Sequence, residues 1–198
     1  ELATLPNVRV LSRTTVFGIY DSREYCAVER VSDHLAHTPE GQPRQRLWKI
    51  VAKRAILATG AIERPLVFGG NDRPGVMTAS SVSTYINRFA AVPGQRAIVF
   101  ATSDSGWATA LDLLDAGTDV AAIVDPREAA NPMAESFRKR GTEVLTGVVT
   151  DVAGAPVRKA MVRLVDGRSR TIAADLVAVS GGWNPAIGLG SNLGARPV

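Results

Sequence analysis

Residues 96–125, RAIVFATSDSGWATALDLLDAGTDVAAIVD, constrain the fold of this chain more than any other segment. They combine a continuous apolar run, a short loop, an amphipathic stretch and a second apolar run that ends in an acidic residue. Continuous apolar runs of this length are typical of strands buried on both faces of a parallel sheet. The segment therefore predicts a strand at 97–100, a helix at 105–116 and a second strand at 120–124, which together form one βαβ unit.

The loop of this unit departs from the glycine pattern of dinucleotide-binding proteins. In the motif G-x-G-x-x-G, the first two glycines shape the turn and admit a pyrophosphate, and the third lets the helix pack on the strand. Here these places hold Ala101, Ser103 and Gly106, and Asp125 stands where an acid would bind the ribose of NAD. We expect these four residues to form a degenerate second nucleotide site in a domain that is mainly structural.

Two further residues of the unit bear on that site. Asp104 stands next to the predicted helix N-terminus. A carboxylate there can accept hydrogen bonds from the free N–H groups and so occupy the place where a phosphate would bind. Trp107 follows near the start of the helix. Either it fills the vacant nucleotide cleft, or it is partly buried against a neighbouring loop.

The rest of the chain predicts elements on both sides of the βαβ unit. Runs of β-branched and apolar residues bounded by turns predict strands at 8–11, 15–20, 25–31, 47–52, 54–60, 143–146 and 175–180, and β structure over 148–171. Apolar residues at helical spacing predict helices at 78–91 and 132–140. The polar stretch at 34–46 predicts a loop.

Together these elements predict an α/β fold. Residues 71–180 are expected to form a Rossmann-like three-layer domain with a parallel sheet, and an antiparallel β-meander precedes it within residues 1–70. The way the sequence starts leads us to expect that the chain is a piece of a longer protein.

Composition excludes some function classes. The net charge of +4 is carried by scattered arginines, which do not form the basic stripe of a nucleic-acid-binding surface. No apolar run approaches the roughly 20 residues that span a bilayer, so no membrane partner is expected. The single cysteine, Cys26, allows no internal disulfide, fits a cytoplasmic protein and is expected to be inert core.

The remaining polar candidates favour structural roles. His34 and His37 have helical spacing for a metal, but Pro39 and Gly41 follow at once and predict a solvated loop. Glu63 and Arg64 are expected to form an ion pair that holds a crossover between domains, and 72–74 a second crossover turn. No residue is predicted to be catalytic or to bind a metal.

Four strings carry a family resemblance: ATGAIERPLVF at 58–68, NDRPGVM at 71–77, VFATSD at 99–104 and SGGWNP at 180–185. With the order of meander, ATG segment and βαβ domain, they resemble the α subunits of heterotetrameric sarcosine oxidase, which belong with the flavoprotein reductases that have two dinucleotide domains. The string ATGA-x-ERP is shared by opine oxidase subunits and related amine dehydrogenases, which are the alternative.

The resemblance implies a part of an enzyme that oxidatively demethylates sarcosine to glycine and passes the one-carbon unit to tetrahydrofolate. The partners that it implies are the remainder of the α subunit, a flavin-carrying β subunit and further subunits of the oxidase. It also implies that the chain is the middle of the α subunit, with residues 1–70 as the C-terminal part of a first FAD/NAD(P)-binding-type domain and 181–198 as a return crossover towards it. NAD, or else FAD, would bind in that first domain, and the βαβ domain would be the second. Val16, whose backbone would face the adenine, and Ala58, Thr59 and Gly60 would form the flank of that first site.

Two other functions remain open. One is an NAD(P)H-binding reductase module, which predicts that the second domain binds NADH. The other is a scaffold domain without catalysis, whose apolar patches bind another subunit of the enzyme or a second copy of the chain. Self-association or disorder is expected near residues 1–60, because an incomplete domain exposes sheet edges.

Overall fold

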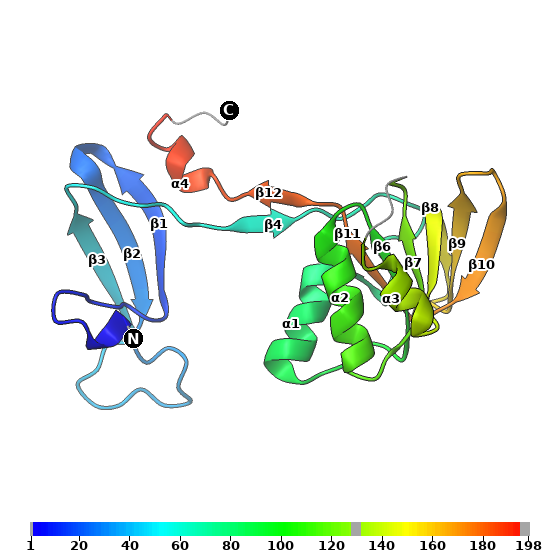
Figure 1. Ribbon diagram of the computed structural model, residues 1–198. Coiled ribbons are helices and arrows are strands. Elements are labelled where there is room, and N and C mark those ends of the chain that lie inside the picture. The colour runs from blue at the N-terminus through cyan, green and yellow to red at the C-terminus, as the bar shows by residue number, and fades with distance from the viewer. Residues whose placement is uncertain (1, 128–131, 195–198) are drawn as a thin grey trace. The chain divides into compact units, whose positions relative to one another are not determined.

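The computed structural model describes residues 2–127 and 132–194 (Figure 1). The chain divides into two compact units, one formed by Glu1–Gly60 with Pro185–Val198 and the other by Ala61–Asn184. The second unit includes the whole 71–180 range expected for the nucleotide-type domain. Residues 195–198 of the expected return segment lie outside the described part of the chain.

The first unit is built on an antiparallel meander with the strand order β1-β2-β3. Its elements are η1 (Leu2–Thr4), β1 (Thr14–Tyr20), η2 (Asp21–Arg23), β2 (Glu24–Arg30), β3 (Gln45–Val51) and the short helix α4 (Gly188–Ser191). The strands predicted at 15–20, 25–31 and 47–52 are confirmed. The polar loop between β2 and β3 is also confirmed, and both His34 and His37 lie in it.

Two predicted strands of this unit are wrong. Residues 8–11 and 54–60 form no strand, and Val10 and Ile56 are 54% and 95% exposed. A β-branched or apolar run becomes a strand only where a neighbouring strand completes its backbone hydrogen bonds. Within the described residues, no strand pairs with either segment.

The second unit contains a mixed sheet with the order β10-β9-β8-β7-β6-β11-β5. Its elements are β4 (Ala61–Glu63), β5 (Val76–Thr78), α1 (Ala79–Phe89), β6 (Arg96–Ala101), α2 (Asp104–Asp115), β7 (Asp119–Asp125), α3 (Ala134–Lys139), β8 (Glu143–Ala153), β9 (Lys159–Leu164), β10 (Ser169–Ala173) and β11 (Leu176–Ser180). A separate short ribbon pairs β4 with β12 (Trp183–Pro185). The strands from β8 to β5 run parallel, and β8, β9 and β10 run antiparallel.

The parallel sheet is buried on both faces, as the apolar runs predict. Along β6, Ala97, Val99 and Ala101 belong to one core cluster, which α1, α2 and α3 cover. The alternate residues Ile98 and Phe100 belong to a second cluster formed with the antiparallel strands. Helices therefore pack on one face (Figure 1), and residues of the antiparallel strands β8, β9 and β10 close the other face, which confirms the Rossmann-like three-layer fold.

Glu63 sets the start of helix α1. Its Oε2 accepts a hydrogen bond of 2.6 Å from the backbone N–H of Ser80, in the first turn of α1. The residue is 6% exposed, and its Oε1 has no hydrogen-bond partner among the described residues. The expected Glu63–Arg64 ion pair is therefore wrong: Glu63 accepts a hydrogen bond from one free N–H group of the helix instead of pairing with a cation.

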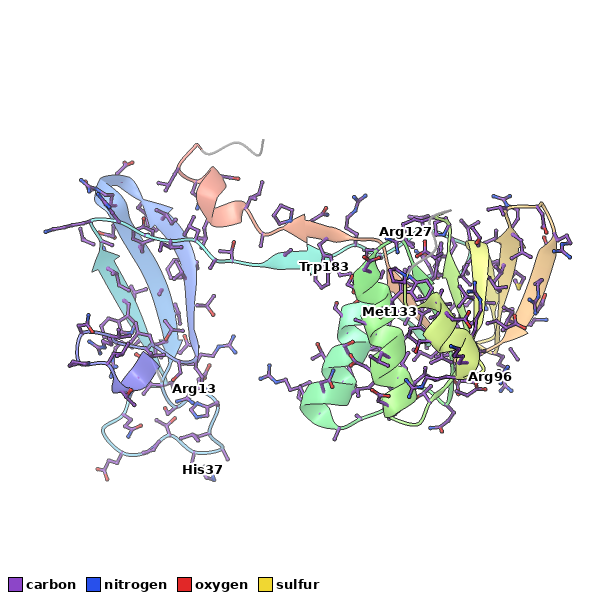
Figure 2. All side chains as sticks on the ribbon, viewed as in Figure 1. Arg13, His37, Arg96, Arg127, Met133 and Trp183 are labelled. Carbon is purple, nitrogen blue, oxygen red and sulfur yellow. The ribbon has the colours of Figure 1, made fainter. Side chains whose placement is uncertain are left out.

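The amino ends and the carboxyl ends of the parallel strands have different roles. Figure 2 labels Arg96 at the start of β6 and Arg127 just after the end of β7. Arg96 forms an ion pair with Asp119 at the start of the neighbouring strand. Arg127 lies at the carboxyl ends of the strands, where open α/β sheets bind ligands.

Candidate functional site

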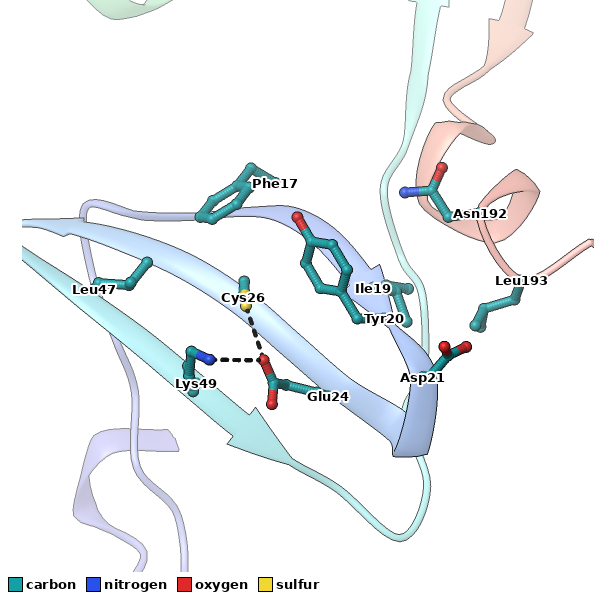
Figure 3. Close-up of a pocket in the computed structure, with 10 residues that line it drawn as sticks. All are labelled: Phe17, Ile19, Tyr20, Asp21, Glu24, Cys26, Leu47, Lys49, Asn192 and Leu193. Atoms are coloured by element: carbon teal, nitrogen blue, oxygen red, sulfur yellow. Dashed lines mark hydrogen bonds and ion pairs between the residues drawn. The ribbon is translucent and has the colours of Figure 1, made fainter.

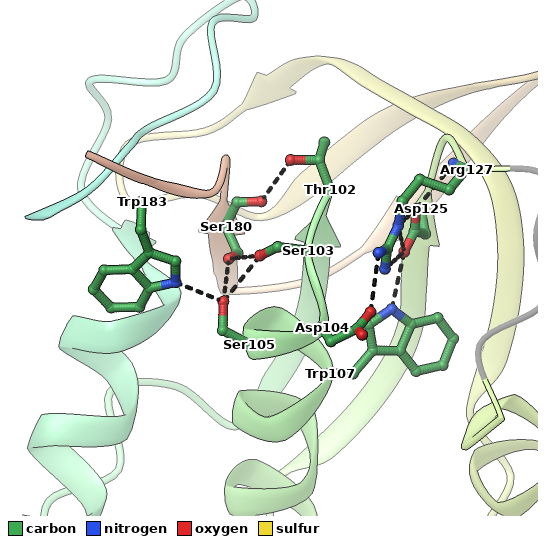
Figure 4. Close-up of polar contacts among 9 residues, drawn as sticks. All are labelled: Thr102, Ser103, Asp104, Ser105, Trp107, Asp125, Arg127, Ser180 and Trp183. Atoms are coloured by element: carbon green, nitrogen blue, oxygen red, sulfur yellow. Dashed lines mark hydrogen bonds and ion pairs between the residues drawn. The ribbon is translucent and has the colours of Figure 1, made fainter. Parts of the chain in front are cut away.

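A cluster of serine hydroxyls lies at the carboxyl ends of the paired strands β6 and β11 (Figure 4). The Oγ of Ser103 lies 2.9 Å from that of Ser105 and 3.0 Å from that of Ser180, and the Oγ atoms of Ser105 and Ser180 are 3.2 Å apart. Ser180 is fully buried. Three side chains therefore meet where a glycine-rich loop would leave room for a pyrophosphate.

The loop is also tied directly to β11 and β12. The backbone N–H of Thr102 donates to the carbonyl of Ser180 at 2.8 Å, and the Thr102 hydroxyl donates to the same carbonyl at 3.2 Å. The indole Nε1 of Trp183 donates to Ser105 Oγ at 3.0 Å. These contacts connect the loop and the first turn of α2 to the two strands.

Gly106 is confirmed as a packing glycine. A Cβ at this position would lie 2.6 Å from the Cβ of Ala101 and 3.0 Å from that of Ser180. Separations this short are not tolerated between carbon atoms, so only glycine lets α2 approach β6 and β11 this closely.

Asp125 is held by its own neighbours at the end of β7 (Figure 4). It is 6% exposed and accepts from Trp107 Nε1 at 2.9 Å. Arg127 donates from its backbone N–H at 2.9 Å, from Nε at 3.0 and 3.1 Å and from Nη2 at 2.7 Å. Each carboxylate oxygen thus accepts at least two hydrogen bonds, which uses the acceptor capacity that a ribose would need.

Arg127 joins this carboxylate to a second one. Its Nη1 lies 2.9 Å from Asp104 Oδ1, so the guanidinium bridges Asp104 at the start of α2 and Asp125 at the end of β7. Asp104, which was expected to cap the helix, forms an ion pair with Arg127. Arg127 itself is a residue that sequence reasoning missed, although its place two residues after Asp125 was a usable signal.

The protonation equilibria of this pair follow from its contacts. Burial alone would raise the pKa of Asp125, but hydrogen bonds from Arg127 and Trp107 outweigh it and leave that pKa below its ordinary value. The hydrogen bond with Asp125 likewise raises the pKa of Arg127. Both groups are therefore charged at neutral pH.

Trp107 is buried more deeply than the sequence predicted. It is 2% exposed, and its ring meets Phe137 edge-on with centroids 5.7 Å apart. The indole therefore belongs to the core under the helices, and its N–H fixes the Asp125 carboxylate.

The residues of the second site do not fit a dinucleotide. Ser103 places a hydroxyl where the pyrophosphate backbone contact requires glycine, and Arg127 occupies the carboxylate expected to hold the ribose. The structure does bring Ala101, Ser103, Gly106 and Asp125 to the same edge of the sheet. Their spatial arrangement is that of a nucleotide domain, while their contacts are internal.

A different cleft lies in the first unit. It has a volume of about 520 Å³ and is lined mainly by apolar atoms. Its walls bring together Val16 from β1 and Ala58 and Thr59 from the extended segment, with Tyr25 and Ile50 from β2 and β3. Three of the four residues expected to flank the first dinucleotide site thus share one cleft.

The ATG segment is held in place by the return segment of the same unit. Thr59 Oγ1 donates to the carbonyl of Ala186 at 2.6 Å, and the Ala186 N–H donates to the carbonyl of Gly60 at 2.9 Å. Gly60 has φ of +72°, a left-handed conformation that favours glycine, and is not among the residues that line the cleft. The small side chains of this segment and the apolar walls fit a flat aromatic group such as adenine.

A second depression of the first unit, about 610 Å³ in volume, contains the cysteine (Figure 3). Glu24 Oε1 lies 3.5 Å from Cys26 Sγ and 3.4 Å from Lys49 Nζ. Burial and the adjacent Glu24 carboxylate raise the pKa of the Cys26 thiol. A thiol kept protonated is a poor nucleophile, in agreement with the predicted inert role.

Within the described ranges, no helix combines the length and the apolar character needed to cross a bilayer. Over the same residues, no group of three or more His, Cys, Asp or Glu side chains is arranged to hold a metal ion.

Comparison with known proteins relates this geometry to a family. No family model matches the chain. The sarcosine oxidase α subunit of Rhizobium meliloti (strain 1021) is 46% identical over 198 residues, which cover 100% of this chain and 20% of the relative. That of Corynebacterium sp. (strain U-96) is 39% identical over 96% of this chain and 21% of the relative. A subunit of opine oxidase from Agrobacterium tumefaciens (strain Ach5) is 28% identical over 65% of this chain and 24% of its own length.

Solved structures agree on the fold. An FAD-dependent pyridine nucleotide-disulphide oxidoreductase from Desulfovibrio vulgaris superposes with a TM-score of 0.64 at 19% identity, over 94% of this chain and 47% of that one. L-proline dehydrogenase from P. horikoshii gives 0.61 at 20% identity, over 92% of this chain and 30% of that one. The chain spans about one fifth of the length of its sarcosine oxidase relatives, and it belongs to the family of sarcosine oxidase α subunits.

Proposed function

We propose that this chain is a dinucleotide-binding scaffold within the α subunit of a sarcosine oxidase-like oxidoreductase. In this proposal, the enzyme demethylates sarcosine or a related amine at a flavin carried by another of its subunits, and this chain holds NAD instead of the reacting flavin. The cleft flanked by Val16, Ala58 and Thr59 takes the adenine end of NAD. The second nucleotide-type domain binds no cofactor and supports the assembly.

The coexistence of one open and one closed site carries this proposal. The first-unit cleft of about 520 Å³ has apolar walls and small side chains, as adenine recognition requires. At the second site, Ser103 and Arg127 fill the positions that a pyrophosphate and a ribose would need. These contacts disfavour the alternative of an NAD(P)H-binding reductase module, whose function depends on the second site.

Opine oxidase is the second candidate for the whole enzyme, since the match to one of its subunits covers 65% of this chain. The two candidates differ in substrate and share the scaffold. Turnover of sarcosine against turnover of opines by the purified protein with its partner subunits separates them.

The proposed NAD site is tested by narrowing its cleft. Ala58→Leu places a larger side chain in the wall, and we expect it to weaken NAD binding at least about tenfold in a calorimetric titration. Ala61→Leu is the matched control, because Ala61 is exposed and is not among the residues that line the cleft. Equal affinities of the two variants for NAD would contradict the proposed site.

A further inference from the structure

The bridge between Asp104, Arg127 and Asp125 has a consequence for binding at the second site, and this consequence rests on the function proposed above. We infer that the Arg127 guanidinium is an internal plug, which occupies the position of a nucleotide ribose on Asp125 and keeps the second cleft closed to NAD. The plug belongs to the chain itself, so no partner or ligand is needed to close this cleft.

The plug is anchored at its buried end. The Asp125 side chain is 8% exposed and receives two nitrogens of the guanidinium, Nε and Nη2. This two-point contact fixes the orientation of the planar group. Asp104 is 77% exposed, so the bond from Arg127 Nη1 to Asp104 is weakened by water and mainly positions the outer edge of the plug.

Asp125 does not depend on the plug for its own orientation. Trp107 Nε1 and the backbone N–H of Arg127 each hold the carboxylate at 2.9 Å, and neither bond involves the Arg127 side chain. Truncating that side chain leaves the carboxylate fixed, with its outer acceptor positions free for the two hydroxyls of a ribose.

The Arg127 side chain is not part of either core cluster of the second unit. It is 38% exposed, and its ion pairs are with Asp104 and Asp125 at the rim of the sheet. Ser103 is a second obstacle, because its hydroxyl joins the cluster at the pyrophosphate position. The test therefore removes both of these obstacles together, with Arg127→Ala and Ser103→Gly.

The test is an NADH titration that counts bound equivalents per chain in the purified protein, for the wild type, R127A and the double variant R127A/S103G. Arg140→Ala is the matched control, since Arg140 pairs with Asp115 at the far end of α2 with a distance of 2.9 Å. We expect the double variant to bind one equivalent more than the wild type, R127A to bind the same equivalent more weakly, and R140A to match the wild type.

Two results would contradict the inference that Arg127 keeps the second site closed. One is a folded double variant, as judged by circular dichroism, that binds no more NADH than the wild type. The other is a wild type whose NADH binding is lost in Asp125→Asn, since the cleft would then be open already. If R127A does not fold, Arg127→Ser takes its place in both variants, because it also removes the guanidinium while keeping a short polar side chain. The plug is tested by the difference in bound NADH equivalents between the wild type and the variants. Failure of the proposed first-unit site would instead remove the one equivalent that the wild type and all variants are expected to bind.

Discussion

At the scale of single residues, the βαβ unit keeps those that hold helix to strand and replaces those that would admit a phosphate. Gly106 retains its contact with Ala101 and Ser180, whereas Ser103 and Arg127 fill the cleft. The sequence was sufficient to predict the packing role of Gly106 and the loss of space at Ser103. It did not predict the Arg127 bridge, because the partners of a long side chain depend on the path of the loop after β7.

Gly106→Ala is expected to destabilise the protein by about 1–3 kcal/mol, the usual cost of forcing a methyl group into a packed core. Urea unfolding measures this loss. Gly188→Ala is the control, because a Cβ at Gly188 meets nothing within 4 Å, and its backbone has no positive φ. Similar unfolding midpoints for the two variants would mean that the close contact with β6 does not limit α2.

The lowered pKa of Asp125 predicts that the stability of the protein depends on pH. Its pKa in the folded protein lies below the ordinary value of 3.8, so the unfolded chain takes up the proton first as the pH falls. The stabilisation is present above pH 3.8 and is lost as the pH falls through the folded-state pKa. Asp33 and Asp166, whose pKa values are also lowered, act in the same direction.

The contribution of Asp125 is isolated by comparing the wild type with Asp125→Asn in thermal unfolding between pH 7 and acid. We expect the variant to be less stable at neutral pH and the difference to shrink as the pH falls below 3.8. A difference that is constant with pH would show that the Asp125 charge makes no net contribution.

At the scale of elements, a strand predicted from the sequence formed only where a neighbouring strand was present to pair with it. The buried strands β6, β7 and β11 were predictable from continuous apolar runs because the parallel sheet covers both of their faces. The runs at 8–11 and 54–60 have similar composition, but no neighbouring strand pairs with them in the described chain. Composition could not distinguish these cases, since a strand requires a partner as well as a propensity.

Helix α1 offers a test at this scale, because Glu63 from β4 accepts the N–H of Ser80. Glu63→Ala removes the acceptor and is expected to cost about 0.5–2 kcal/mol, as loss of a helix cap does. Glu63→Gln retains a carbonyl oxygen for the same bond and should cost less. Chemical denaturation compares the variants, and an equal loss in both would show that the Glu63 charge, not the Ser80 bond, stabilises α1.

At the scale of the whole molecule, our proposal assigns the chain two nucleotide-type regions with opposite properties. Sequence motifs and the order of elements were enough to predict the α/β fold and the family. The resemblance implied that Val16, Ala58 and Thr59 flank one site, and they do line one cleft. The local patterns of these segments could not have predicted this, because the residues come together only through the path of the segment after β3. The central claim is that NAD contacts this cleft, while the second domain is closed by its own side chains.

Hydrogen–deuterium exchange of the purified protein with and without NAD tests this claim most directly, because it locates binding along the chain. We predict that NAD slows amide exchange at 14–16 and 55–60 and leaves 101–107 and 125–127 unchanged. Slower exchange at 101–107 and 125–127, with none at 14–16 and 55–60, would contradict the account.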